Sequence, residues 1–182
     1  RKEAEEVLRA SESVMRISTK AREMVFEACG FQPYILQLIC NELFHRMKFS
    51  GRDVVAPFDL REVIEQKILP NENYFTDYET LVGDTHPILY GLALGHRRAG
   101  ARGRSFVSIS DIQQELAREG IEYGQEFIKE TLNSLTEGYS SGLNERPLVE
   151  QAKNNPRLFK LIIGLLGDHL IRQGVNNGGH SL

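Results

Sequence analysis

Apolar residues recur at helical spacing throughout residues 1–83, and we predict that this whole stretch is helical. Each segment has an apolar face, formed by Ala4, Val7, Leu8, Val14 and Met15 in the first, by Ala21, Met24, Val25, Ala28 and Cys29 in the second, and by Ile35, Leu36, Leu38, Ile39, Cys40, Leu43 and Phe44 in the third. The third segment is apolar on most of its faces, which is typical of the central helix of a bundle. Residues 1–83 are therefore expected to form a small helical-bundle domain.

Residues with strong start and stop preferences separate these predicted helices. Ser18 or Thr19 offers an N-cap for the second helix, and Gly30 is placed to end it. Pro33 suits the first turn of the third helix, expected over about 34–47, because the N–H that proline lacks has no partner there.

A fourth helix is predicted from the pair Asp59 and Glu62, read as a capping box with Asp59 as the N-cap. Phe58 and Val63 have the spacing of a hydrophobic staple around that start, and Pro70 would end the helix. A further amphipathic segment is expected after it, with Tyr74, Phe75, Tyr78, Leu81 and Val82 on its apolar face.

The pattern changes after Gly83, where helical and strand-like segments alternate. A helix is predicted from Thr85 or Pro87 to about Gly95, and a strand over 106–109 follows it. Two further helices are predicted, one capped by Ser110 and ended by Gly120 and one over about 123–136, whose apolar face consists of Phe127, Ile128, Thr131, Leu132 and Leu135. Two strands near 148–151 and 158–163, joined by a turn at 153–156, precede a closing helix. This order predicts a winged-helix domain over residues 84–174 in a mainly α chain. Residues 175–182 have nothing to bury and are expected to be a disordered tail.

Several classes of function lack their sequence signals. There is no GxxxxGK[ST] phosphate loop and no acidic strand to hold magnesium, and the five histidines have no second His or Cys at metal-ligand spacing. We therefore predict no catalytic site and no metal site. No apolar run is long enough to span a bilayer, and Cys29 and Cys40 are expected to be core thiols of a cytoplasmic protein.

The segment Gly30-Phe31-Gln32-Pro33-Tyr34-Ile35-Leu36-Gln37-Leu38-Ile39-Cys40 resembles the "GGxPYLLQLLC" segment in the lid of AAA-like ATPases of the STAND type, close to the origin-recognition branch. Flanking matches are Val54-Val55 before Phe58-Asp59-Leu60, then Ile68-Leu69 and Tyr74-Phe75. The resemblance implies a lid that closes over ATP and magnesium held by a P-loop domain absent from this chain. The first residue already lies in a helical pattern, which also indicates a fragment.

In that family the Gly-x-Pro turn packs beside the adenine of ATP. The resemblance carries this cofactor-binding role to Gly30 and Pro33, with Gln32 and Tyr34 as neighbours. Phe31 replaces the family's small residue, and no arginine stands in the first turns of the Tyr34 helix, so contact of the lid with the γ-phosphate is not expected. From the residues alone, a helix end at Gly30 and a helix start at Pro33 are the favoured interpretation, and the resemblance reverses that preference.

An alternative function is nucleic-acid binding by a basic loop over residues 96–104 and by the wing. The candidate residues are Arg97, Arg98, Arg102 and Arg104 in the loop, and Lys153, Arg157 and Lys160 in the wing. The helix that would read DNA argues against it, because residues 122–137 carry four glutamates and one lysine. We therefore expect the winged helix to relay nucleotide state to a protein partner, with DNA binding as the alternative and a stand-alone scaffold as a third reading.

Overall fold

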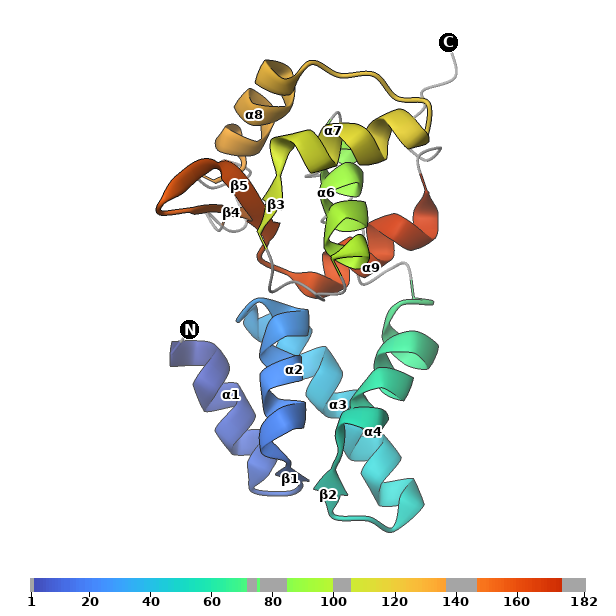
Figure 1. Ribbon diagram of the computed structural model, residues 1–182. Coiled ribbons are helices and arrows are strands. Elements are labelled where there is room, and N and C mark those ends of the chain that lie inside the picture. Colours follow the sequence, from blue (N-terminus) through green and yellow to red (C-terminus); the bar gives the residue numbers. More distant parts are fainter. Residues whose placement is uncertain (1, 72–74, 76–84, 100–105, 137–146, 175–182) are drawn as a thin grey trace. The chain divides into compact units, whose positions relative to one another are not determined.

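The computed structural model describes residues 2–71, 75, 85–99, 106–136 and 147–174, and within them the chain is mainly α-helical (Figure 1). The described part contains eight α-helices, and the last of them follows a C-terminal antiparallel hairpin. The chain divides into two compact units, Arg1–Tyr74 and Phe75–Leu182. The domain boundary predicted at residues 83 and 84, the amphipathic segment predicted there apart from Phe75, and the predicted tail over 175–182 lie outside the described residues.

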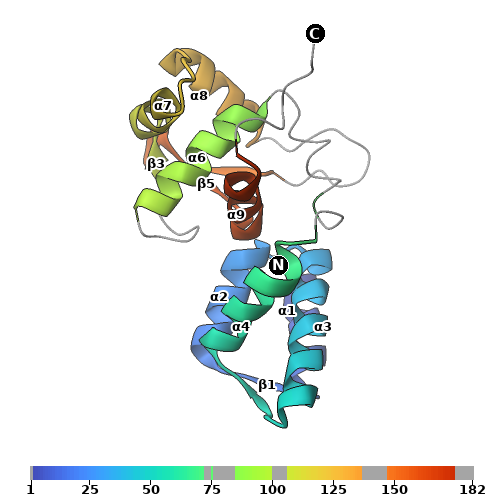
Figure 2. The same ribbon diagram turned by 90° about the vertical axis from the view of Figure 1, so that its right-hand side faces the viewer.

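The first unit is built around one long helix, α3. In chain order its elements are α1 (Lys2–Glu12), β1 (Arg16–Ile17), α2 (Thr19–Cys29), α3 (Pro33–Ser50), β2 (Val54–Val55), α4 (Pro57–Val63) and a π-helical turn, η1 (Ile64–Ile68). Helix α3 packs against α1, α2 and α4 (Figures 1 and 2). Its buried residues are Ile35, Leu36, Ile39, Cys40, Leu43 and Met47, which confirms its predicted place at the centre of the helices.

Three of the predicted helix ends are confirmed, and each has a local chemical cause. The Ser18 hydroxyl accepts the Ala21 N–H and caps α2. Gly30 ends α2 in the left-handed conformation, with its own N–H donated to the Phe26 carbonyl. Pro33 occupies the first turn of α3.

The predicted start of the fourth helix is wrong by three residues, because the N-cap is Ala56 rather than Asp59. Helix α4 begins at Pro57, so Asp59 is its third residue, and the Asp59 carboxylate reaches back to the Ala56 N–H at 3.0 Å. The staple between Phe58 and Val63 does not form, because Phe58 is 59% exposed while Val63 is buried. Because the helix begins at Pro57, Phe58 lies in its first turn, on the exposed side of the helix.

Residues 1–83 are also not wholly helical as predicted. Strands β1 and β2 pair in parallel, Arg16 opposite Val54 and Ile17 opposite Val55. A two-residue strand is too short to produce an alternating pattern, so only its long-range partner identifies it.

In its described residues, the second unit combines four helices with a three-stranded sheet. Its elements are α6 (His86–Arg98), β3 (Val107–Ser108), α7 (Ile109–Arg118), α8 (Gln125–Ser134), β4 (Val149–Ala152), β5 (Asn155–Leu161) and α9 (Gly164–Gln173), in the order predicted. The strands lie in the order β3-β5-β4 and are antiparallel to their neighbours. Helix α6 packs against α7, α9 and strand β5 (Figure 1). Leu89 and Leu92 of α6 and Phe159 of β5 are fully buried.

Helix α6 does not end at Gly95 as predicted; it continues to Arg98. A Cβ atom on Gly95 would lie 2.5 Å from Val107 Cγ1, so the glycine is there for a close approach to β3. His96 and Arg97 consequently belong to the helix, and the predicted loop over 96–104 is wrong in its first part. His96 is buried, and its Nε2 accepts the Leu161 N–H at 3.0 Å.

Smaller differences affect α7, α8 and the hairpin. Ser108, rather than Ser110, caps α7 by accepting the Asp111 N–H. Strand β5 begins at Asn155, so Pro156 lies in the strand rather than in the predicted turn. Phe127 was predicted on the apolar face of α8 but is 52% exposed, whereas Ile128 and Leu132 are buried.

None of the helices formed by the described residues is both long enough and apolar enough to cross a membrane.

Candidate functional site

The turn between α2 and α3 reverses the chain within three residues. Gly30 and Phe31 both have positive φ angles, 56° and 60°. The Gln32 N–H then donates to the Cys29 carbonyl at 2.9 Å. Two successive left-handed residues are uncommon, and the second, a phenylalanine, requires compensation from elsewhere.

That compensation comes from the side chain of Phe31. Its ring stacks on the Phe26 ring, with centroids 4.7 Å apart and planes at 24°. The Arg22 guanidinium carbon lies 5.9 Å from the centre of the Phe26 ring. The phenylalanine that replaces the small residue of the lid segment is thus turned back onto α2.

The four residues predicted to bind the nucleotide lie together on this turn. Gly30, Gln32 and Pro33 are half-buried, and Tyr34 is 55% exposed. Gln32 has an extended backbone, and its carbonyl accepts the Leu36 N–H at 3.0 Å. Gly30 and Pro33 do serve as a helix end and a helix start, and they also form part of the accessible surface.

The turn carries no charged side chain. The first arginine of α3 is Arg46, in the second half of the helix, and the structure pairs it with Asp59 and Glu62. Cys29, just before the turn, is buried, and burial raises the pKa of its thiol to about 11. Burial likewise raises the pKa of the Cys40 thiol. Both predicted core thiols are confirmed as buried and free, and both stay neutral.

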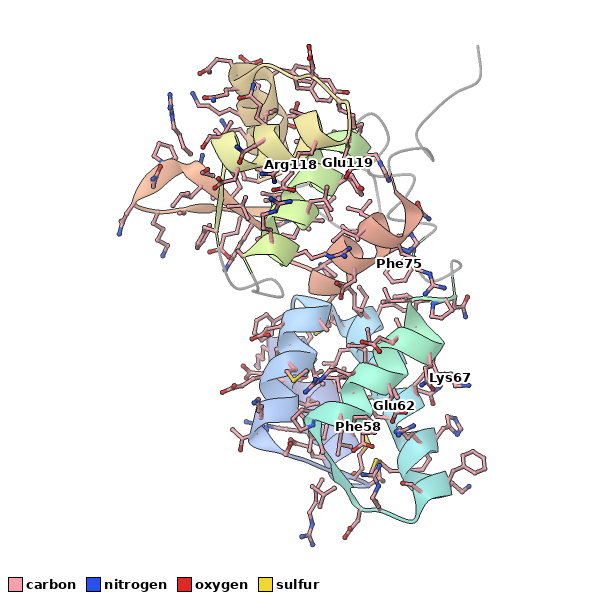
Figure 3. All side chains as sticks on the ribbon, turned by 45° about the vertical axis from the view of Figure 1, so that its right-hand side comes forward. Phe58, Glu62, Lys67, Phe75, Arg118 and Glu119 are labelled. Carbon is pink, nitrogen blue, oxygen red and sulfur yellow. The ribbon has the colours of Figure 1, made fainter. Side chains whose placement is uncertain are left out.

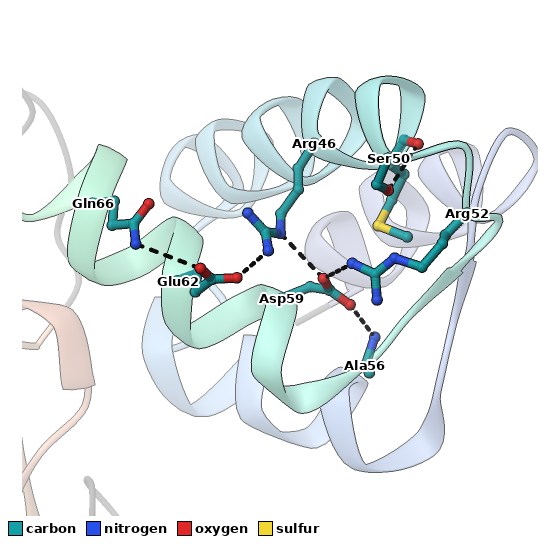
Figure 4. A network of polar contacts seen from close by, with 8 residues as sticks. Arg46, Ser50, Arg52, Ala56, Asp59, Glu62 and Gln66 are labelled. Carbon is teal, nitrogen blue, oxygen red and sulfur yellow. Dashed lines mark hydrogen bonds and ion pairs between the residues drawn. The ribbon is translucent and has the colours of Figure 1, made fainter.

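A network of ionic contacts at the other end of α3 went unpredicted (Figure 4). Asp59 is fully buried and accepts from Arg46 Nε at 3.1 Å and from Arg52. Arg46 also donates to Glu62, whose other oxygen accepts from the Gln66 amide at 3.5 Å. Phe58 and Glu62 lie one turn apart on α4 (Figure 3), and the Arg46 guanidinium carbon is 5.9 Å from the Phe58 ring centre.

This network keeps the Asp59 carboxyl ionised. Burial alone would raise its pKa, but the Ala56 N–H, Arg46 and Arg52 outweigh that effect, and the pKa is lowered from its ordinary value. The carboxylate ties α4 to α3 and to the segment before β2. Its polar atoms face one another, so the network is a structural element of the first unit.

The basic residues proposed for nucleic-acid binding do not form a single cluster. Arg98 pairs with Glu115 of α7 at 2.9 Å. Lys160 pairs with Glu150 across the hairpin at 3.0 Å, and its Nζ lies 4.9 Å from the centre of the Phe106 ring. Arg97 is exposed at the end of α6, Lys153 and Arg157 are exposed on the hairpin, and Arg102 and Arg104 lie outside the described residues.

An open groove between α7 and the turn that leads to α8, here called the α7–α8 groove, was also not predicted. It has a volume of about 900 Å³, and its walls are Ser110, Asp111, Gln113, Gln114, Ala117, Ile121, Glu122, Tyr123 and Gly124. Gln113 donates to the Tyr123 carbonyl at 2.8 Å, and the Gln125 amide donates to Gln113 at 3.1 Å. Glycines 120 and 124 mark the turn in the sequence, but the groove depends on how that turn folds back beside α7.

The parts of the chain that the structure describes contain no group of three or more His, Cys, Asp or Glu side chains arranged to hold a metal ion. His86, His96 and His169 are buried, and the His169 ring stacks on Phe75 with centroids 4.1 Å apart.

No match was found when the chain was compared with protein-family models, with curated proteins and with solved structures. The candidate sites therefore rest on geometry and on the sequence segment that starts at Gly30.

Proposed function

We propose that this chain is the lid and winged helix of an AAA-like ATPase of the STAND type. In this account the first unit closes over ATP and magnesium bound to a P-loop domain of the same protein. The second unit then relays the state of the nucleotide to a protein partner. The chain itself performs no chemistry; it would report, by its position, whether ATP is bound.

The α2–α3 turn is the observation that carries this proposal. It is a tight turn with no charged side chain, and two left-handed residues lead into Pro33. A glycine permits close approach of a ligand, and a proline ring offers a rigid apolar face to a base. Tyr34 adds an exposed aromatic ring beside them. The same residues begin the segment that resembles the lid of these ATPases.

The winged-helix part of the proposal is supported by the order of elements in the second unit. A helix and a short strand precede the helix pair α7–α8, and a hairpin follows it. The first strand adds to the hairpin at β5, giving the order β3-β5-β4. In the proposed winged helix, α8 would be the recognition helix of the helix-turn-helix.

Calorimetric titration with ATP tests the lid assignment, since a lid supplies only one wall of the nucleotide site. The 182-residue chain should neither bind ATP measurably nor hydrolyse it, whereas the longer protein should bind it. The coding sequence upstream of Arg1 should contain a phosphate loop and an acidic magnesium strand. Micromolar binding of ATP by this chain alone would contradict the proposal. An upstream sequence without a phosphate loop would also contradict it and would favour the third function, a stand-alone scaffold.

The second candidate function is nucleic-acid binding, which the exposed Lys153 and Arg157 of the hairpin favour. Two cations on a protruding wing can contact phosphates without reading bases. Fluorescence polarisation with a labelled DNA duplex at about 50 and about 200 mM salt separates the two functions, because phosphate-driven binding weakens steeply with salt. Salt-sensitive binding that is lost in a Lys153→Ala, Arg157→Ala double variant would favour this function over a protein partner.

A further inference from the structure

The first turn of α8 and the loop before it carry two aromatic rings, Phe127 and Tyr123, at the surface of the second unit. Phe127 is 52% exposed, and its ring stacks on that of Tyr123, with centroids 5.2 Å apart and planes at 28°. The stacked rings, here called the aromatic pair, lie next to the α7–α8 groove, because Tyr123 also forms part of its wall. Exposed aromatic side chains beside a concave surface are typical of protein interfaces, where they supply much of the binding energy.

The groove has a defined shape before any partner binds. The side-chain amide of Gln113 in α7 donates to the Tyr123 carbonyl, and the side-chain amide of Gln125 in α8 donates to Gln113. These two hydrogen bonds fix the turn between the helices. Gly120 ends α7 with a φ of 77°, and the Ile121 N–H donates back to the Leu116 carbonyl at 2.9 Å. A partner therefore meets a preorganised surface, which lowers the entropy lost on binding.

The charges around the aromatic pair select the kind of partner. The groove is lined by Asp111 and Glu122, and α8 adds Glu126 and Glu130, both exposed. The one lysine of α8, Lys129, is itself paired with Glu126 at 3.3 Å. Phosphate groups are repelled by such a surface, whereas lysine and arginine side chains are attracted to it and can also stack on aromatic rings.

We propose that the α7–α8 groove and the aromatic pair form a docking surface for a basic segment of a partner protein. Its lysine or arginine side chains would meet the four carboxylates, and an apolar side chain between them would cover Phe127. This proposal deepens the proposed function by giving the chemistry of the partner, and it rests on that function only for the role of the second unit as a protein contact. The proposal involves no nucleotide.

Fluorescence polarisation on the 182-residue chain tests this surface. The probe is a labelled amphipathic peptide with arginines and leucines, and its counterpart has glutamate at every arginine. The basic probe should bind, with an affinity that falls when the salt is raised from about 50 to about 200 mM. Phe127→Ala and Glu130→Lys should each weaken binding about fivefold or more. Binding of the acidic counterpart with equal affinity would overturn the proposal.

Matched variants in the first unit control for non-specific binding of the probe. Phe49 is 89% exposed and Glu6 is exposed, so Phe49→Ala and Glu6→Lys change the same chemistry away from the groove. Neither should alter binding of the basic probe. Equal losses for Phe49→Ala and Phe127→Ala would overturn the proposal, as would a DNA duplex that displaces the probe from the groove. Self-association lost in Phe127→Ala would instead make a second copy of this chain the occupant.

The peptide assay contains no ATP, so it is independent of the lid assignment. Absence of peptide binding would leave the lid assignment unchanged, and a failed ATP titration would leave the peptide result unchanged.

Discussion

Two sets of carboxylates, one in each unit, lie in opposite environments. In the first unit Asp59 is fully buried and bonded to Arg46, Arg52 and a backbone N–H. In the second unit Glu126 and Glu130 lie exposed on α8. A buried, paired carboxylate holds a fold together, while an exposed group of them shapes what can approach from outside.

The surfaces left for partners differ in the same way. The first unit offers an uncharged turn at Gly30 and Pro33, and Arg46, the arginine of α3, is paired with Asp59. The second unit offers an acidic groove beside two aromatic rings. An uncharged, rigid turn suits a nucleobase, and an acidic groove suits a cationic segment. The comparison therefore assigns different ligand chemistry to each unit.

Removing the charge of Asp59 should have the largest effect on stability. Asp59→Asn leaves two arginines without their shared carboxylate, and because both arginines are partly exposed we expect the first unit to lose roughly 2 to 3 kcal/mol. Hydrogen exchange of amides in α2 and α3 in increasing urea measures this loss locally.

Two variants make this a test of the comparison. Asp53→Asn and Glu130→Gln remove exposed carboxylates, one in each unit, and should each change stability by less than about 0.5 kcal/mol. If Glu130→Gln proved as costly as Asp59→Asn, the distinction between structural and surface carboxylates would fail.

A smaller effect is expected on acidification. The Asp59 pKa is lower in the folded chain than the value of about 3.9 for a free aspartate, so its contribution to stability is present above that pH. That contribution is lost as the pH falls through the folded pKa. The difference in unfolding free energy between the wild type and Asp59→Asn should therefore narrow below about pH 4. A difference that stays constant down to about pH 2 would show that the ionised carboxylate is not the cause.

Sequence reasoning succeeded where local chemistry decides the structure. Ser18, Gly30 and Pro33 each satisfy a backbone requirement within a few residues, so their roles could be predicted. Cap assignments failed where one pattern fits two registers. An aspartate followed three residues later by a glutamate suits both an N-cap and a third helical position, and Pro57 decided between them.

Predictions also failed where a distant residue decides the structure. A glycine such as Gly95 often ends a helix, but here its missing side chain makes room for Val107 of β3. The pairing of β1 with β2 joins residues far apart in the chain. The candidate turn was predicted because one continuous segment carries its pattern, whereas the Asp59 network depends on arginines from two segments.

The ATP affinity of the longer protein carrying Pro33→Ala tests the lid assignment most directly. Loss of the apolar face that Pro33 would set against the base should weaken ATP binding by about 1 kcal/mol, or roughly fivefold to tenfold, with the melting temperature unchanged. Pro57→Ala is the matched control, because Pro57 also occupies the first turn of a helix in the same unit, and it should leave ATP affinity unchanged. Equal ATP affinity in wild type and Pro33→Ala would contradict the account.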